Sequence, residues 1–243
     1  MAYIEHGTAG AGTHVVARPV DGHAAVGEQN WLEFSRSSRV RSTRLDQHSV
    51  VFYEGDAASR VYEVIEGAVM LYKLLPDGRR QVVDVLGPND VFGLPRGSTH
   101  DCNAETLTKT VLRVFDRKDA ETRIEVQNHI SRCLMAQVEK LHDHAVLLGR
   151  KSAFERVASF LFRCIPDCSG TKCDGSGSHR GAAQNVIVLT MTRQEIADYL
   201  GLTIETVSRV ISDFKRKGLI ALEKQDHIRI NSVCGLCRLT GAH

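Results

Sequence analysis

Residues 190–230 constrain the fold of this chain more strongly than any other segment. Thr192 and Glu195 have the spacing of a capping box, which predicts the start of a short helix. Gly201 predicts the end of that helix, and Thr203 predicts the cap of a second helix that runs to about Lys217. Two helices joined by a short turn that contains glycine are typical of a helix-turn-helix.

The apolar residues of both predicted helices fall on one side, as a buried face requires. They are Ile196, Ala197 and Leu200 in the first helix, and Val207, Val210, Ile211 and Phe214 in the second. After Gly218, two predicted strands at Leu219–Leu222 and His227–Ile230 form a small hairpin, so the unit is winged. Such a unit can also serve as a protein-contact module, which stays open as the alternative.

The polar face of the second predicted helix favours DNA. The first turns of a recognition helix point at base edges in the major groove. Arg209 can bond guanine at two positions, Glu205 can accept from the amino group of cytosine, and Ser208 leaves room for a thymine methyl group. We expect these three residues to contact bases.

The overall charge argues against a protein that binds nucleic acid by bulk attraction. The formal net charge is +2, so affinity must come from local placement of cations, hydroxyls and backbone amides. The candidates for contacts to DNA phosphates are Thr192, Thr203, Thr206, Lys215 and Lys217.

The region from Arg44 to Phe115 has the pattern of an all-β unit. Short apolar runs recur at roughly ten-residue spacing between turn signals, which favours a sandwich or barrel. Asp77-Gly78 predicts a hairpin with a type I′ turn. The predicted strands are Val50–Tyr53, Val61–Ile65, Val69–Leu74, Gln81–Leu86 and a final run at Thr106–Phe115. Residues 1–30 are rich in glycine and alanine, and we expect a mobile arm there.

A long helix is predicted between about Arg117 and Gly149. Its apolar stripe consists of Val126, Ile130, Leu134, Val138, Leu141, Ala145 and Leu148. Such a helix either lies on its own barrel or forms a dimer seam with a second copy, and the seam is favoured. A shorter helix is predicted at Ala153–Ile165, and a Gly/Ser-rich loop at residues 168–181.

In this order, the elements resemble the cAMP receptor protein/FNR superfamily of bacterial transcription regulators. The resemblance is carried by the stretch Met191–Arg209, and it covers roughly residues 32–230. The pattern Glu205-x-x-Ser208-Arg209 is similar to the FNR and FixK branch, and without the FNR-type cysteine cluster the chain most resembles the FixK-like members. The resemblance implies an α+β fold with an antiparallel β-roll, a long dimerisation helix and a C-terminal winged helix-turn-helix. The expected domains are the arm (1–30), the β-roll (31–116), the dimerisation helix (117–150) and the DNA-binding domain (151–243).

The resemblance also implies a function. It implies a cytoplasmic homodimer that binds a TTG…CAA palindrome through Glu205, Ser208 and Arg209 and contacts RNA polymerase, as an activator in low-oxygen gene control and nitrogen fixation. Members that bind cAMP carry a Gly-Glu and an Arg-Ser pair, and the matching stretch Phe92–Ser98 contains neither. Residues 1–101 contain no cysteine for an FNR-type iron–sulfur cluster. We therefore expect no cofactor. No run approaches the ~18 apolar residues of a membrane span, so no membrane contact is expected either.

Seven cysteines leave three interpretations open: plain thiols, which are favoured, redox-sensitive thiols, and a zinc or iron–sulfur site. Cys164, Cys168 and Cys173 are the redox candidates, because Lys172 favours thiolate and the loop is expected to be exposed. Cys133 is expected in the core, and Cys234-x-x-Cys237 is a weak metal signal. The residue pair His142 and His144 cannot chelate one ion on a helix, because residues two apart point to different sides.

Two further function classes compete with a regulator that has no effector. One is a sensor regulator gated by haem, a small molecule or a metal in the roll or at the cysteines. The other is a cupin-like enzyme with an appended winged helix. The strand region between Arg44 and Leu86 holds a single histidine, His48, whereas such enzymes cluster metal ligands on their strands, so we expect no enzyme.

Overall fold

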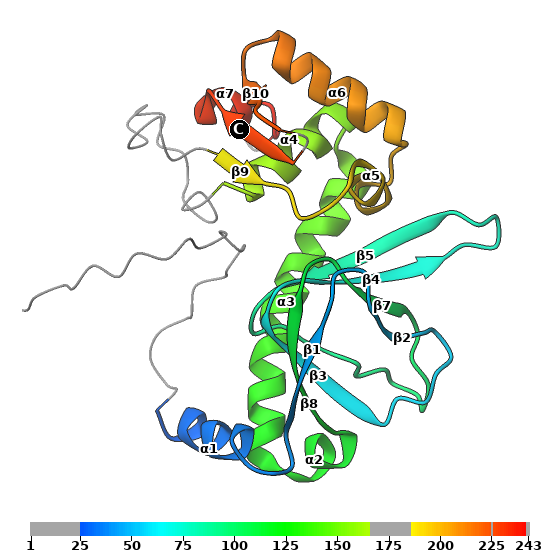
Figure 1. The fold of residues 1–243 in the computed structure, drawn as a ribbon, viewed down its shortest axis with the longest axis vertical. Coiled ribbons are helices and arrows are strands. Elements are labelled where there is room, and N and C mark those ends of the chain that lie inside the picture. The colour runs from blue at the N-terminus through cyan, green and yellow to red at the C-terminus, as the bar shows by residue number, and fades with distance from the viewer. Residues whose placement is uncertain (1–24, 166–185, 225, 242–243) are drawn as a thin grey trace, which may run out of the picture.

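The computed structural model describes residues 25–165, 186–224 and 226–241. Figure 1 shows a β-rich body at one end, a long helix beside it, and a smaller helical domain at the other end. The elements of the body are α1 (Ala25–Ser35), β1 (Arg41–Leu45), β2 (Val50–Phe52), β3 (Arg60–Glu66), β4 (Val69–Leu74), β5 (Arg80–Leu86), β6 (Val91–Phe92), β7 (Asn103–Thr106) and β8 (Thr110–Asp116). They are followed by α2 (Arg117–Thr122), α3 (Ile124–Arg150), α4 (Ala153–Arg163), β9 (Val186–Val188), α5 (Arg193–Leu200), α6 (Ile204–Arg216), β10 (Ile220–Leu222), β11 (His227–Ile230) and α7 (Val233–Arg238).

The β-rich body is a roll of two four-stranded antiparallel sheets, ordered β1-β8-β3-β6 and β2-β7-β4-β5. Apolar residues of both sheets form the core, among them Phe52, Val64, Val69, Leu86 and Leu112. The α+β architecture predicted from the sequence is therefore confirmed. The final predicted run, Thr106–Phe115, is split between two strands, because the chain turns at residues 107–109.

The hairpin between β4 and β5 is present, but the type I′ turn predicted for it is wrong. Its central residues are Pro76 and Asp77, since the amide of Gly78 donates to the carbonyl of Leu75 at 2.9 Å. The proline ring fixes φ near −65°, so a turn that begins with positive φ is excluded. The left-handed conformation falls on Gly78 instead, with φ of 83°.

The chain is helical from Ala25, so the predicted arm extends too far at residues 25–30. Residues 1–24 of that arm lie outside the described part. Trp31 and Phe34 of α1 are buried against Phe115 and against the start of α3, which is the reason this helix is held in place. The indole of Trp31 also stacks on His129, with 3.8 Å between the ring centroids.

The long helix differs from its prediction in two respects. It is interrupted at Arg123, which is extended and separates α2 from α3. Val126 and Ile130, predicted to lie in a dimer seam, are 0% and 7% exposed because they pack on Trp31 and its neighbours in the same chain. The prediction is therefore wrong for these two residues.

The C-terminal half of α3 does carry an exposed apolar face. Leu134, Val138 and Leu141 are 40–46% exposed, and Ala145 beyond them is also exposed. Leu148, the last residue of the predicted stripe, packs partly against a core that α3 shares with the C-terminal domain. The start of α3 therefore lies on its own roll, as one of the two alternatives for this helix predicted, and a dimer seam along the exposed residues stays a prediction.

The C-terminal domain contains the predicted helix-turn-helix and wing. The wing has three strands in the order β10-β11-β9, so β9 adds a strand that was not predicted. Helix α7 was not predicted either, and its residues Val233 and Leu236 complete the core. Helix α4 begins at Ala153 as predicted, whereas the predicted loop at residues 168–181 lies outside the described residues. Among the described helices, none is long and apolar enough to cross a membrane.

Candidate nucleic-acid interface

The helix-turn-helix is built from local interactions that the sequence encodes directly. The amide of Glu195 donates to the Thr192 hydroxyl at 3.2 Å, and the amide of Thr192 donates to the Glu195 carboxylate at 2.7 Å. Gly201 ends α5 in the left-handed conformation with φ of 61°. The Thr203 hydroxyl accepts from the amide of Thr206 and starts α6. The predicted capping box and glycine break are confirmed.

The three residues expected to contact bases lie together on an open face. Glu205, Ser208 and Arg209 are exposed on the first turns of α6, while the opposite face of that helix is buried. In Figure 1, α6 lies at the end of the molecule away from the β-roll. A recognition helix needs this exposure, because it must enter a groove about as wide as the helix itself.

Neighbouring groups at the start of α6 stabilise the ionised carboxylate of Glu205. Its own backbone amide and the Thr203 hydroxyl hydrogen-bond to the carboxylate, and with the nearby Arg209 they lower the pKa of Glu205. The carboxylate is therefore an acceptor at neutral pH, as an interaction with the amino group of cytosine requires. Arg209 presents donors beside it, so one helical turn offers both an acceptor and a donor to base edges.

The residues proposed for phosphate contacts are less uniform. Thr192, Thr203 and Lys215 are exposed at the ends of α5 and α6. Thr206 is half-buried, and its hydroxyl lies 3.1 Å from that of Thr203. The ammonium of Lys217 lies 4.4 Å from the centroid of the Phe154 ring, so this side chain already has a partner within the domain.

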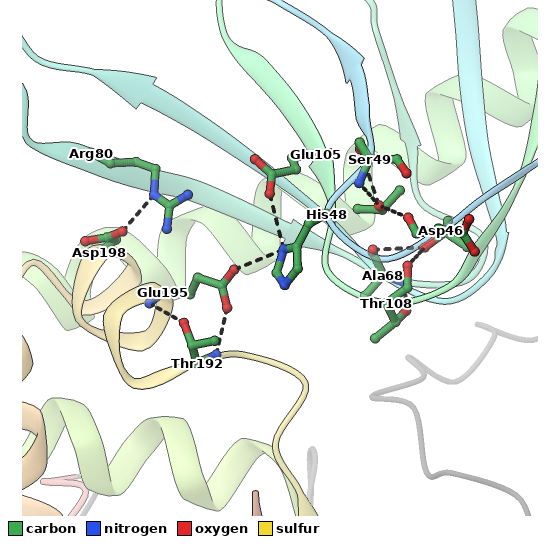
Figure 2. Close-up of polar contacts among 12 residues, drawn as sticks. Asp46, His48, Ser49, Ala68, Arg80, Glu105, Thr108, Thr192, Glu195 and Asp198 are labelled. Atoms are coloured by element: carbon green, nitrogen blue, oxygen red, sulfur yellow. Dashed lines mark hydrogen bonds and ion pairs between the residues drawn. The ribbon is translucent and has the colours of Figure 1, made fainter.

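Polar residues that the sequence analysis missed join the helix-turn-helix to the roll, as Figure 2 shows. The Arg80 Nε atom donates to the Asp198 carboxylate at 2.7 Å. His48 of the β1–β2 turn lies 3.2 Å from Glu105 and 3.6 Å from Glu195. No local pattern could have identified the contacts between the two domains. Arg80 and Asp198, like His48 and Glu195, lie more than a hundred residues apart in the sequence.

A second set of contacts joins α5 to the long helix. The guanidinium of Arg156 in α4 donates to the carbonyls of Leu148 and Lys151 at the end of α3, and to that of Leu200 at the end of α5. The distances are 2.8–2.9 Å. The Tyr199 ring stacks on His144 of α3 at 4.2 Å. Helix α5 is thus held against the end of α3 as well as against the roll.

Comparison with known proteins identifies the family. A family model described as "Bacterial regulatory proteins, crp family" matches residues 189–220, and one described as "Cyclic nucleotide-binding domain" matches residues 42–126. The nitrogen fixation regulation protein FixK of Rhizobium meliloti is 40% identical over 172 residues, which cover 71% of this chain and 74% of that protein. The chain belongs to the CRP/FNR superfamily, in its FixK-like branch.

Further relatives agree with this assignment. FixK of Bradyrhizobium diazoefficiens is 37% identical over 186 residues, covering 75% of each chain. The solved structure of FixK2 from Bradyrhizobium japonicum has a TM-score of 0.69 and 34% identity, and the match covers 84% of this chain and 98% of that one. The chain is a FixK/FNR-type DNA-binding transcription regulator.

Aromatic side chains of this FixK-like protein pack closely beside Phe92–Ser98, the stretch that lacks the residue pairs of superfamily members that bind cAMP. Phe52 stacks on His100 with 3.5 Å between centroids, and Tyr62 packs against Phe92. A Cβ atom on Gly93 would lie 2.8 Å from the Tyr62 ring, so backbone and ring are in close contact. Arg96 and Ser98, the residue types found in cAMP sites, are exposed.

The cysteine predictions have different outcomes. Burial raises the pKa of Cys164 to about 11, which disfavours the thiolate that oxidation requires, so the redox role of Cys164 stays a prediction with less support. Cys168 and Cys173 lie outside the described residues. Cys133 is partly buried against the core around Trp31, in agreement with its predicted place, and burial raises its pKa to about 12. Among the described residues, no three potential ligand side chains gather into a metal-binding group.

Proposed function

We propose that this protein binds a TTG…CAA palindrome as a homodimer, with Glu205, Ser208 and Arg209 reading the bases. One observation supports this most directly: the three side chains share an exposed face at the start of α6, while the apolar residues on its opposite face are buried. Exposed Thr192, Thr203 and Lys215 supply phosphate contacts on either side of the bases. Thr206 and Lys217 are weaker candidates, because they already have partners.

The dimer is formed through the exposed half of α3. Leu134, Val138, Leu141 and Ala145 follow the alternating spacing of a two-helix seam. Met135, 70% exposed, lies beside the seam. A two-fold axis through this seam gives two recognition helices related by symmetry, as a palindromic site requires.

The regulator acts without cAMP and without an FNR-type iron–sulfur cluster. The packed aromatic residues in the roll and the departures at Phe92–Ser98 support the first statement. The absence of cysteine from residues 1–101 supports the second. The protein works in the cytoplasm, where it contacts RNA polymerase and activates genes needed at low oxygen and for nitrogen fixation. The names of two relatives, nitrogen fixation regulation protein FixK of Rhizobium meliloti and anaerobic regulatory protein of Haemophilus influenzae, support the nitrogen-fixation and low-oxygen roles. It has no catalytic activity.

The direct test is selection of bound sequences from a random DNA pool, followed by gel shifts on the selected palindrome and its base-changed variants. We expect TTG and CAA half-sites. A pool with no enrichment, or enrichment of unrelated sequences, contradicts the proposed reading.

The dimer is tested by sedimentation of Leu141→Glu. A charge in the seam should yield monomers and abolish binding to the palindrome. The matched control is Leu74→Glu, which places the same charge on an exposed apolar residue of the β4–β5 hairpin. Monomeric behaviour of both variants, or of neither, contradicts the assigned seam. A reporter gene under the palindrome, compared in air and at low oxygen, tests the regulatory role.

A further inference from the structure

We propose that the ion pair between Arg80 and Asp198 positions the recognition helix and sets the spacing of the half-sites that the dimer accepts. This inference rests on the proposed function, because it concerns how the roll orients the DNA-binding domain in each subunit of the proposed dimer. Neither residue is on the reading face, and the pair joins the β-roll to α5, the helix that precedes the recognition helix. Both are therefore positioning residues.

The pair is well shielded from solvent. The Asp198 side chain is 9% exposed and the Arg80 side chain is 25% exposed, at a distance of 2.7 Å. The guanidinium of Arg80 also lies 5.4 Å above the centroid of the Tyr72 ring. The second carboxylate oxygen of Asp198 accepts from Gln194 at 2.7 Å. The pair is geometrically selective, because a small rotation of α5 on the roll would move the Asp198 carboxylate, which Gln194 holds in place on the helix, away from the Arg80 Nε atom.

The apolar surroundings of the pair belong to both domains. Met70, Tyr72 and Val82 of the roll lie in one buried cluster with Ile196 and Leu200 of α5. Packing of this kind resists separation but is not directional. The ion pair supplies the direction, because only one orientation of α5 on the sheet brings Asp198 to Arg80.

A second polar contact acts near the start of α5. Glu195, whose carboxylate caps the helix by accepting from the Thr192 amide, also lies 3.6 Å from His48. Figure 2 shows the two contacts at different points along α5, with Asp198 facing Arg80 and Glu195 facing His48. Two contacts separated along a helix prevent it from pivoting about either one.

The orientation of α5 passes on to α6 and to the dimer axis. Leu202 donates to the carbonyl of Ala197 across the Gly201 turn at 3.0 Å, so α6 follows α5 through a fixed connection. Helix α5 is also tied to the end of α3 through Arg156. The roll therefore stabilises one angle between the recognition helix and the seam.

A fixed angle predicts a strict spacing. Recognition helices of a dimer enter grooves about one helical turn apart, and one added base pair rotates a half-site by roughly 35°. A dimer whose DNA-binding domains are fixed to the roll should lose much of its DNA affinity when the spacer length changes. A dimer whose DNA-binding domains are released from the roll should lose less.

The experiment compares Arg80→Gln with the wild-type chain on palindromes whose spacer is native, one base pair shorter or one base pair longer. We expect Arg80→Gln to bind the native palindrome about tenfold more weakly, while the additional loss from a changed spacer becomes smaller. The preferred bases within each half-site should stay the same. The matched control is Arg79→Gln, because Arg79 pairs with Asp77 on its own hairpin tip and should retain the wild-type spacing profile.

A double-mutant cycle separates the ion pair from a general loss of stability. Arg80→Gln, Asp198→Asn and the double variant should give similar spacing profiles, since each removes the same interaction. Hydrogen exchange should show faster exchange of the α5 amides in all three and an unchanged roll.

Two results would overturn the inference: an unchanged spacing profile in Arg80→Gln, or altered base preference within the half-site. If the wild-type protein fails to bind any palindrome, the proposed function fails instead. In that case, if the α5 amides exchange hydrogen at the same rate in the variants as in the wild type, the ion pair does not hold α5 in place.

Discussion

The two helices of the helix-turn-helix are neighbours in the sequence but differ in what surrounds them. In α5 every residue from Glu195 to Leu200 is buried, including two carboxylates. In α6 a single apolar face is buried, and the polar residues of the first turns stay in solvent. A single structural motif thus contains one helix whose polar face is open to solvent and another whose acidic side chains are paired inside the molecule.

This difference shows that polar residues in one motif can have opposite purposes. Glu205 of α6 has an exposed carboxylate available to a partner. Asp198 and Glu195 of α5 also carry carboxylates, yet Asp198 binds Arg80 and Glu195 caps the helix. A polar side chain on a predicted helix is therefore no evidence of function until its surroundings are known.

The largest effect should follow from a cavity in α5. Leu200→Ala removes a fully buried side chain from the core shared by the roll and the C-terminal domain, and should lower the free energy of unfolding by about 2–5 kcal/mol. Urea denaturation measures it. Lys215→Ala on the exposed face of α6 is the control and should stay within about 0.5 kcal/mol. Similar losses in both variants would remove the contrast between the helices.

The next effect depends on pH and concerns Asp84 of β5, whose charge also acts on Tyr199 of α5. Burial, followed by repulsion from Asp90, raises the pKa of Asp84 from 3.8 to about 6. A raised pKa means that the folded state holds the proton more tightly, so its contribution to stability is present below pH 4 and is lost as pH rises through 6.

Asp84→Asn should therefore be the more stable protein at pH 8, by about 2–3 kcal/mol. The difference from wild type should shrink through pH 6 and vanish near pH 4, as thermal or urea unfolding across this range can show. A constant difference at every pH would mean that the Asp84 charge is not the cause.

On α6 the expected effect is on binding. Arg209→Ala should cost about 1–3 kcal/mol of DNA affinity and relax the choice of the base that Arg209 reads, because a bidentate contact is lost. The free energy of unfolding should hardly change, since the side chain is exposed. Fluorescence anisotropy on the palindrome and its variants measures the affinity. Retained discrimination between bases would assign the reading to another residue.

The smallest effect compares the helix caps. Thr192→Ala removes a full capping box from α5 and should cost about 1 kcal/mol of stability. Thr203→Ala on α6 should cost less, about 0.5 kcal/mol, because Thr206 at the third position cannot complete the box. Unfolding without DNA keeps the phosphate contacts of both threonines out of the measurement. Equal costs would show that the reciprocal bond adds nothing here.

The features that sequence reasoning predicted are those encoded within a few residues. The cap at Thr192, the break at Gly201, the exposed polar face of α6 and most strands follow from short-range patterns. The turn at Pro76 was missed although the proline was visible, because the dipeptide after it has a strong preference of its own.

The rest depends on which surfaces meet in three dimensions. A stripe with helical spacing identified the buried face of α3 but not its partner, so Val126 and Ile130 were assigned to a second subunit instead of to Trp31. The contacts of Arg80 and His48 with α5 could not be predicted, because nothing near either residue in the sequence marks a partner so far away.

The hydrophobic core that the roll shares with the DNA-binding domain limits how freely the two domains can be exchanged. Domains of regulators are often treated as exchangeable parts, but in this protein residues of the roll complete the hydrophobic core of the DNA-binding domain. Tyr72 and Val82 cover α5 from the roll, and Arg80 neutralises Asp198 there. A chimera that joins this DNA-binding domain to another roll must keep these roll residues. Without them, the apolar side chains of α5 and the charge of Asp198 would be exposed to solvent.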